Sequence, residues 1–170
     1  MPRLAPLALL AAAALLAQGC GYHLVQGYRA KGGADRVQVG AFENDSVDPE
    51  LGALVTAALR EELARRGALG EAGAPARLEG TIRASEGVPS TPNSTTFRVA
   101  VEVRARLQVA GRGPEEVTVR REAEHLAGAD ALEAEGRRAM LLRRLATDVA
   151  HELLVALEAP QDAPAPQRAP

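Results

Sequence analysis

Apolar and polar side chains alternate without a break over residues 97–109. Every odd position in this stretch is apolar, whereas the even positions are mostly charged. A long period of two predicts a strand with one face on a core and the other in water. The residues expected to face the core are Phe97, Val99, Val101, Val103, Ala105, Leu107 and Val109.

Three shorter stretches alternate in the same way, at residues 36–42, 77–84 and 116–125. Gly111, Gly113 and Pro114 separate the last of these from residues 97–109, which predicts a hairpin. The inward-facing residues expected in the three stretches are Val37, Val39, Ala41, Leu78, Gly80, Ile82, Ala84, Val117, Val119 and Ala123.

Two further stretches repeat apolar residues at helical spacing. The first begins after Asp48, which is expected to be the N-cap with Pro49 at the first helical position, and it ends near Arg66. The second begins after Asp130 and ends near Leu157. The apolar stripes are formed by Leu51, Leu54, Val55, Ala58, Leu59 and Leu63, and by Leu142, Leu145, Ala146, Val149, Leu153 and Ala156.

The order strand, helix, three strands, helix over residues 36–158 predicts a single α/β (α+β) domain. We expect a two-layer sandwich in which two amphipathic helices pack on one face of a four-stranded mixed sheet. The first two strands flank a helix and are therefore expected to be parallel. The remaining connections are hairpins, which makes the other pairs antiparallel.

The amino-terminal residues show the pattern of an export signal, without the apolar periodicity of a strand or an amphipathic helix. Arg3 precedes an apolar segment over residues 4–17, which is too short for a membrane-spanning helix of about 20 residues. The only cysteine of the chain, Cys20, follows the small residue Gly19. We therefore predict a lipoprotein signal peptide over residues 1–19 and lipid attachment at Cys20, with an incidental free thiol as the alternative. Gly21, in place of aspartate, favours the outer membrane.

Two segments next to the domain have no apolar pattern. Residues 20–35 are rich in glycine and are predicted to be the lipidated N-terminus and a tether that leads from it. Residues 159–170 contain four prolines and are predicted to be a disordered tail.

The charge is balanced, with 22 acidic and 20 basic residues, which argues against nucleic acid as a partner. The three histidines are scattered without metal-ligand spacing, and no catalytic or cofactor motif is present in the sequence. We therefore expect no enzymatic activity, no cofactor and no metal site. Glu61 and Glu62 are interpreted as a solvated helix face.

Arg98, Arg104 and Arg106 occupy even positions of the longest predicted strand, so they share its water-facing side. The simpler interpretation is a solvated face on which arginines pair with Glu122 or Glu124 across the hairpin. The other is recognition of phosphate or acidic sugar groups, which the guanidinium fork binds with two hydrogen bonds. These three arginines are the candidate ligand-binding residues.

The predicted mature N-terminus, Cys20-Gly21-Tyr22-His23-Leu24, resembles that of the LptE family of lipopolysaccharide-assembly lipoproteins. Phe42-Glu43-Asn44 and the order of elements over about residues 20–158 resemble the family as well. The resemblance implies a non-enzymatic protein held by its lipid on the periplasmic side of the outer membrane. It also implies two partners, lipopolysaccharide and the LptD β-barrel, whose lumen the protein plugs. The basic residues with which the family contacts lipopolysaccharide cannot be matched here by motif.

A second class of function remains open, because other lipoproteins share the motif Phe42-Glu43-Asn44. This alternative is a periplasm-facing regulatory or scaffolding lipoprotein, similar to activators of cell-wall synthases or to curli-secretion lipoproteins. The identity of the partner that copurifies with the anchored protein distinguishes the two.

Overall fold

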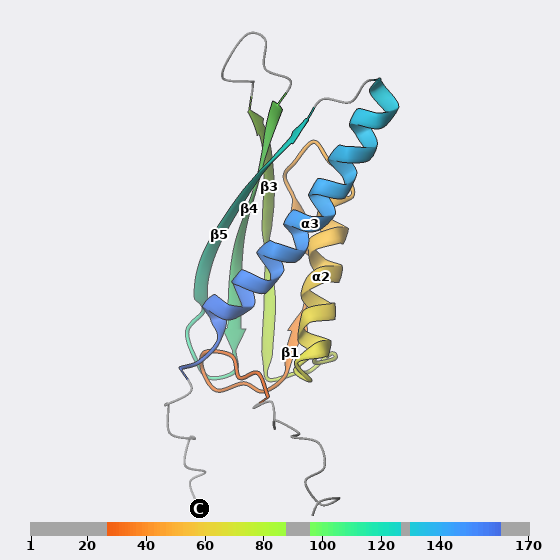
Figure 1. The fold of residues 1–170 in the computed structure, drawn as a ribbon. Helices are drawn as coiled ribbons and strands as arrows, with labels where there is room; N and C mark the ends of the chain where they lie inside the picture. Colours follow the sequence, from red (N-terminus) through yellow and green to blue (C-terminus); the bar gives the residue numbers. More distant parts are fainter. Residues whose placement is uncertain (1–26, 88–95, 127–129, 161–170) are drawn as a thin grey trace, which may run out of the picture.

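The computed structural model describes residues 27–87, 96–126 and 130–160, which form a sheet layer and a helix layer (Figure 1). The predicted α+β two-layer sandwich is confirmed. The elements in chain order are β1 (Val37–Val39), β2 (Glu43–Asn44), α2 (Leu51–Arg65), β3 (Ala76–Gly87), β4 (Thr96–Val109), β5 (Glu115–Leu126) and α3 (Ala131–Leu157).

The sheet has the strand order β1-β3-β4-β5, and β2 pairs with β3 beyond β1. β1 and β2 run parallel to β3, whereas the long strands β3, β4 and β5 form two successive antiparallel pairs. In the β4–β5 turn, Gly111 adopts a φ of 75°, which suits a residue without a side chain. The sheet has five strands instead of the expected four because Glu43–Asn44, which follow the first predicted strand, also pair with β3.

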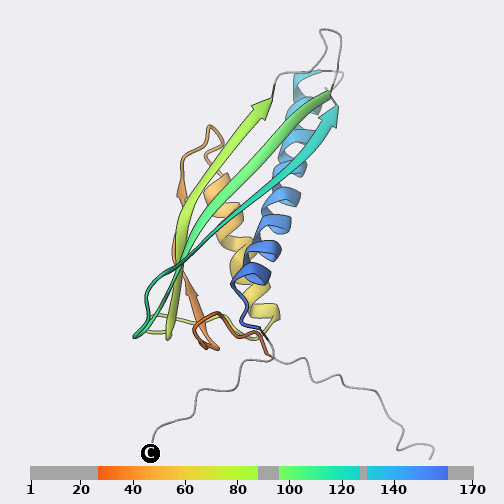
Figure 2. The ribbon, with the colours of Figure 1, turned by 90° about the vertical axis from the view of Figure 1, so that its left-hand side faces the viewer.

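Both helices cover the same face of the sheet, here called the inner face (Figures 1 and 2). They run from the upper end, where β3 and β5 finish, to the lower end, where β4 finishes. The alternation of β4 is observed as predicted, with Val101 and Val103 completely buried between the layers. Phe97, at the upper end of the strand, is half-buried.

The first predicted strand breaks at residues 40–42, where the side-chain alternation shifts by one residue. Ala41, which we expected in the core, is exposed, and Phe42 is buried in its place. Gly80 of β3 leaves the space for this ring, because a Cβ there would lie 2.8 Å from Phe42 and 2.1 Å from a carbonyl oxygen of β4. The packing of Phe42 against a strand glycine therefore reverses the face predicted for Ala41.

The start of α2 also differs from the prediction. The helix begins at Leu51, and its N-cap is Glu50, whose side chain makes no capping hydrogen bond. The carboxylate of Asp48, the expected N-cap, instead forms two hydrogen bonds with Arg138 of α3. Asp48 is therefore engaged in tertiary structure, since a bidentate charged pair is stronger than one cap bond.

Glu62 lies between the two helices and is only 6% exposed, so the predicted solvated face is wrong at this position. Its carboxylate accepts a hydrogen bond from Arg66 Nε at 2.7 Å and lies 3.3 Å from His151 Nδ1 on α3. Glu61 is exposed, as expected. The buried carboxylate is thus compensated by neighbouring cationic and polar groups.

Residues 27–35, which we predicted to be part of a tether, fold onto the lower end of the domain. Tyr28 is 3% exposed and Ala30 is fully buried. Ala30 forms a β-bridge with Glu158, and backbone hydrogen bonds join the segment to the end of α3. The structured domain therefore starts several residues earlier than the alternation indicates. The predicted leader, Cys20 and the tail beyond Pro160 lie outside the described residues.

Neither of the two described helices combines the length and apolarity that are needed to cross a bilayer.

Candidate functional site

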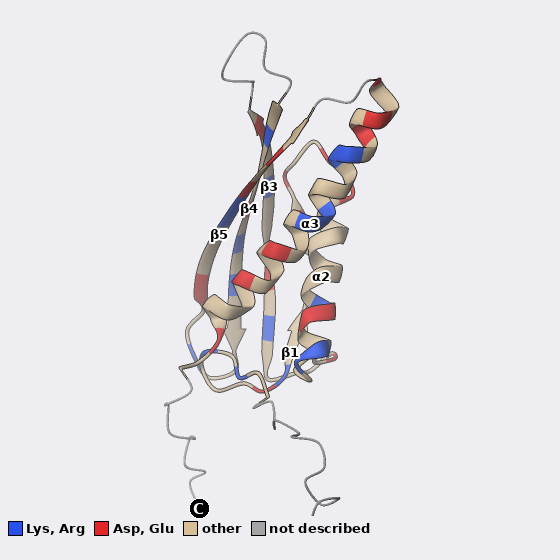
Figure 3. Ribbon diagram, in the orientation of Figure 1, with Lys and Arg blue, Asp and Glu red and all other residues tan. Residues whose placement is uncertain are grey.

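The three arginines selected from the sequence lie on β4 and point to the outer face, which the helices leave uncovered. The side chains of Arg98, Arg104 and Arg106 are each more than half exposed. Basic and acidic residues are interspersed along β3, β4 and β5 (Figure 3). The prediction that the three share one strand face is therefore observed in the fold.

Each of these arginines forms an ion pair with a glutamate. The pairs and their N–O distances are Arg98–Glu124 at 2.8 Å, Arg104–Glu102 at 3.1 Å and Arg106–Glu116 at 2.7 Å. The hydrogen bond to the paired carboxylate raises the pKa of Arg98 and likewise that of Arg106. The cross-strand pairing with Glu124, expected for a solvated face, is thus present at Arg98.

Arg104 and Arg106 border a hollow of about 500 Å³ on the outer face. The hydroxyl-bearing residues Thr81 and Thr118 line it as well. Arg98 is six residues from Arg104, which corresponds to roughly 20 Å along a strand. The structure therefore brings two of the three arginines together and leaves Arg98 near the upper end of the sheet.

The hollow has both basic and acidic side chains in its lining. Glu43, Glu79 and Glu116 line it together with the two arginines. Exposed ion pairs of this kind contribute about 0–1 kcal/mol each, so an arginine can exchange its carboxylate for another anion at low cost. The arrangement suits a ligand that offers phosphate groups beside hydroxyl groups.

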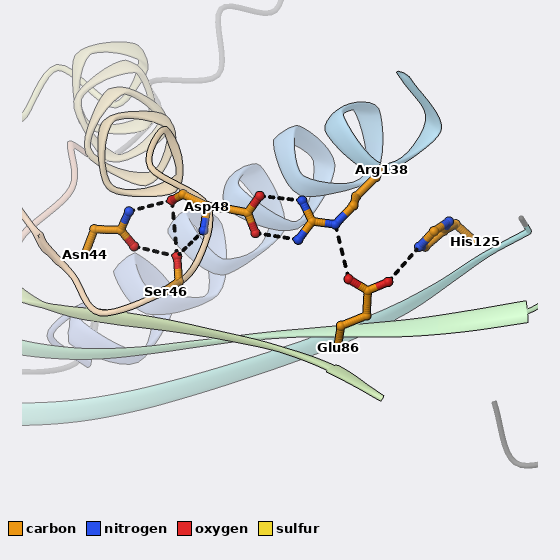
Figure 4. Close-up of polar contacts among 6 residues, drawn as sticks. All are labelled: Asn44, Ser46, Asp48, Glu86, His125 and Arg138. Atoms are coloured by element: carbon orange, nitrogen blue, oxygen red, sulfur yellow. Dashed lines mark hydrogen bonds and ion pairs between the residues drawn. The ribbon is translucent and has the colours of Figure 1, made fainter. Parts of the chain in front are cut away.

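A second polar cluster lies at the upper end, between the layers (Figure 4). Arg138 of α3 binds both carboxylate oxygens of Asp48, and its Nε lies 3.2 Å from Glu86 Oε2 on β3. Glu86 Oε1 lies 3.8 Å from Nε2 of His125, whose ring stacks on Phe97. Sequence reasoning missed this cluster because Asp48 matches a helix cap and Arg138 matches a solvated helix face.

The described histidines have structural neighbours. His125 belongs to the upper cluster, and His151 lies beside Glu62. No group of three or more potential metal ligands occurs among the described residues. His23 and Cys20, the predicted lipid-attachment residue, are outside the described part of the chain, so Cys20 remains a prediction.

Comparison with known proteins gives one family match. The family model described as "LptE: Lipopolysaccharide-assembly" matches residues 34–157. No curated protein matches this chain in sequence.

Solved structures share the fold at low sequence identity. Rare lipoprotein B from Shewanella oneidensis is 16% identical, with a TM-score of 0.53 over 70% of this chain and 92% of that chain. A minor lipoprotein from Acinetobacter baumannii is 12% identical, with a TM-score of 0.51 over 74% of this chain and 96% of that chain. At these identities the similarity establishes a common fold.

Proposed function

Because this chain belongs to the LptE family of lipopolysaccharide-assembly proteins, we propose that it is an outer-membrane lipoprotein that plugs and assists an LptD-like β-barrel. In this function it faces the periplasm, is held by a lipid on Cys20, and helps the barrel place lipopolysaccharide on the cell surface.

The extent of the family match carries this proposal. Residues 34–157 contain every described strand and helix, so the match concerns the whole sandwich and not an isolated motif. The predicted export signal over residues 1–19 supports the same function, because the lipid predicted on Cys20 is a membrane anchor. The proposed role is one of binding and positioning, without catalysis.

The place where the chain enters the domain supports a membrane-anchored orientation. Tyr28, the first buried residue in the described part of the chain, is eight residues after Cys20 and lies at the lower end. Eight extended residues reach at most about 29 Å. A lipid on Cys20 therefore keeps the lower end within about 30 Å of the membrane surface, while α3 extends for about 40 Å towards the upper end.

Arg104 and Arg106, together with Arg98 above them, are the proposed contacts for lipopolysaccharide phosphates or acidic sugars. Glu116 is exposed and Glu102 is partly exposed, and the threonines of the hollow offer hydroxyl groups to the same ligand. Phosphate accepts two hydrogen bonds from one guanidinium, which favours exchange of the partner.

Purification of the tagged protein from detergent-solubilised membranes, with Cys20 intact, tests the main proposal. We expect recovery of a large outer-membrane β-barrel in equal amount, and less surface lipopolysaccharide when the protein is depleted. Recovery of a cell-wall synthase without a barrel would replace the proposal by the regulatory alternative.

A pair of triple variants tests the arginine contacts. The substitutions Arg98→Gln, Arg104→Gln and Arg106→Gln together should lower lipopolysaccharide binding severalfold at low salt. The loss should shrink at moderate salt, because screening weakens attraction between exposed charges.

The matched control removes the same number of charges from the outer face. Arg77, Arg83 and Arg120 are also exposed and ion-paired, and their joint replacement by glutamine should leave binding largely unchanged. If both triple variants and the unmodified protein bind lipopolysaccharide equally well, the arginines of β4 do not contact the ligand and form an ordinary solvated face.

A further inference from the structure

The first three turns of α3 differ from the rest of the helix in how they are attached. None of residues 131–141 is fully buried, although all of them belong to the described part of the chain. From Leu142 onwards the helix has a continuous buried stripe that ends at Leu157. The apolar core therefore holds the lower part of α3 and reaches the upper part only at Leu141, which is partly buried against it.

Arg138 connects this upper part to two other elements. Its guanidinium binds Asp48, in the loop before α2, through both terminal nitrogens, and its Nε binds Glu86 near the end of β3 (Figure 4). The side chains of Arg138 and Asp48 are only 18% and 14% exposed. One side chain thus joins α3, the loop and the sheet above the buried stripe of α3.

The loop holds Asp48 in position for this contact. Asn44 Nδ2 donates to the carbonyl oxygen of Asp48 at 2.6 Å, and the Ser46 hydroxyl donates to Asn44 Oδ1 at 2.6 Å. The backbone N–H of Asp48 donates to Ser46 Oγ at 3.3 Å. Because these bonds fix the turn, the carboxylate meets Arg138 with little loss of conformational freedom.

The residue that Arg138 binds on the sheet, Glu86, belongs to a row near the upper end of the inner face. Glu86 is opposite Val99 in the β3–β4 register, and Val99 is opposite Ala123 in the β4–β5 register. Val99 is 1% exposed, and the next residue pair upward is Phe97 with the stacked His125. Phe97, Val99 and Ala123 therefore form an apolar strip of the sheet beside the charged contact.

From these contacts we infer that residues 131–141 form a gate, which Arg138 holds closed through Asp48 and Glu86. The gate swings about the point where the buried stripe begins, between Leu141 and Leu142. Opening uncovers the apolar strip of Phe97, Val99 and Ala123 without unfolding the core below it. This property of the fold goes beyond the proposed function and does not depend on it.

The physical basis of the gate is the difference between the two kinds of attachment. Apolar packing is lost gradually as surfaces separate, whereas the Arg138 contacts break together because one guanidinium makes all of them. When they break, Asp48 and Glu86 regain water, so the open form is not penalised by buried, unpaired charges. Local opening of a segment with few core contacts is expected to be much more frequent than global unfolding.

Hydrogen exchange of the full chain in detergent, followed by mass spectrometry, tests the gate with Arg138→Met. Methionine keeps an apolar stem and removes the guanidinium. We expect exchange of residues 135–141 and 43–48 to become at least about tenfold faster, and exchange of residues 142–157 to stay unchanged. Binding of an environment-sensitive apolar dye such as bis-ANS should rise in parallel.

Arg137→Met is the matched control on the neighbouring residue. Arg137 is exposed and pairs with Glu133 of its own helix, so its loss removes one intrahelical contact and nothing between elements. Exchange of residues 135–141 should change by about twofold at most, since such pairs contribute about 0.2–0.5 kcal/mol. This control separates opening of the gate from ordinary fraying of the helix.

Two results would overturn the inference. Unchanged exchange in Arg138→Met means that other contacts hold the upper turns, and equal acceleration throughout α3 means that the helix opens as one unit. Glu86→Gln is a milder second variant, which keeps the side-chain shape and leaves Asp48 bound. This substitution should speed up hydrogen exchange in the same segments by a smaller factor than Arg138→Met. An exchange rate equal to that of the unmodified protein would contradict the role of Glu86.

Discussion

At the scale of single residues, Tyr28 shows how a buried polar group can lack a partner. Its hydroxyl has no hydrogen-bond partner among the described residues, and the guanidinium of Arg66 lies 5.6 Å from the centre of its ring. Burial, reinforced by the negative charge of Glu158, raises the pKa of Tyr28 well above its usual value of 10.0. At a pH somewhat above 10, the hydroxyl therefore stays protonated in the folded protein, whereas the same group is ionised in the unfolded chain.

Tyr28→Phe should remove this dependence on pH. For a raised pKa, the contribution to folding is complete below the unfolded value near 10 and is lost as pH rises above it. Near pH 8 the free energies of unfolding of the variant and the unmodified protein should therefore differ by about 1 kcal/mol at most. The reason is that the Tyr28 hydroxyl has no hydrogen-bond partner to lose. At more alkaline pH the variant should be the more stable of the two. Denaturant unfolding at both values checks this, and identical pH profiles would contradict it.

At the scale of elements, β4 is the strand on which the two layers depend. It pairs along its length with β3 on one side and β5 on the other. Its inward-facing residues belong to the hydrophobic core between the sheet and the helices. Its outward-facing charged residues are instead engaged in ion pairs at the surface. Two neighbouring positions of one strand therefore have very different environments.

Substitutions at adjacent positions of β4 should show this contrast. Val101→Asp buries a carboxylate without a partner at a fully buried position and should destabilise the fold by more than about 4 kcal/mol. Glu102→Ala removes a partly exposed ion pair with Arg104 and should cost about 1 kcal/mol or less. Thermal melts monitored by circular dichroism check both, and similar melting temperatures would contradict the assignment of faces.

At the scale of the whole molecule, the two ends of the sandwich are constructed differently. At the lower end, the chain that follows the predicted lipid site is bound to the end of α3 through the Ala30–Glu158 bridge. At the upper end, the ion pairs of Arg138 with Asp48 and Glu86 attach α3 to the loop before α2 and to β3. The end proposed to lie near the membrane is thus fixed, and the gate is at the opposite end.

Cys20→Ala should leave the protein as an unprocessed precursor or release it from the membrane, because lipidation precedes cleavage of lipoprotein leaders. The folded domain should remain intact, since Cys20 is eight positions before Tyr28, the first buried residue that the structure describes. Mass spectrometry of the mature N-terminus of the unmodified protein gives the direct check. An unmodified Cys20 there, or a start at another residue, would contradict the lipoprotein prediction.

The sequence by itself determined the order of elements, the two-layer sandwich and the faces of β3 and β4. These follow from local periodicity, since a period of two or of 3.6 residues places apolar groups on one side whatever they later contact. The sequence also determined which face carries Arg98, Arg104 and Arg106. Their shared side of β4 is fixed by the parity of their positions.

Only the tertiary structure decided which residues meet across elements. Ala41 turns outward because Phe42 packs at Gly80, a contact between positions far apart in the chain. Asp48 meets Arg138 across 90 residues and therefore does not cap α2. Glu62 is buried because a second helix brings His151 beside it. A carboxylate near a helix start or on a helix face has the same local pattern whether water or a distant guanidinium faces it, so the outcome depends on the packing of the layers.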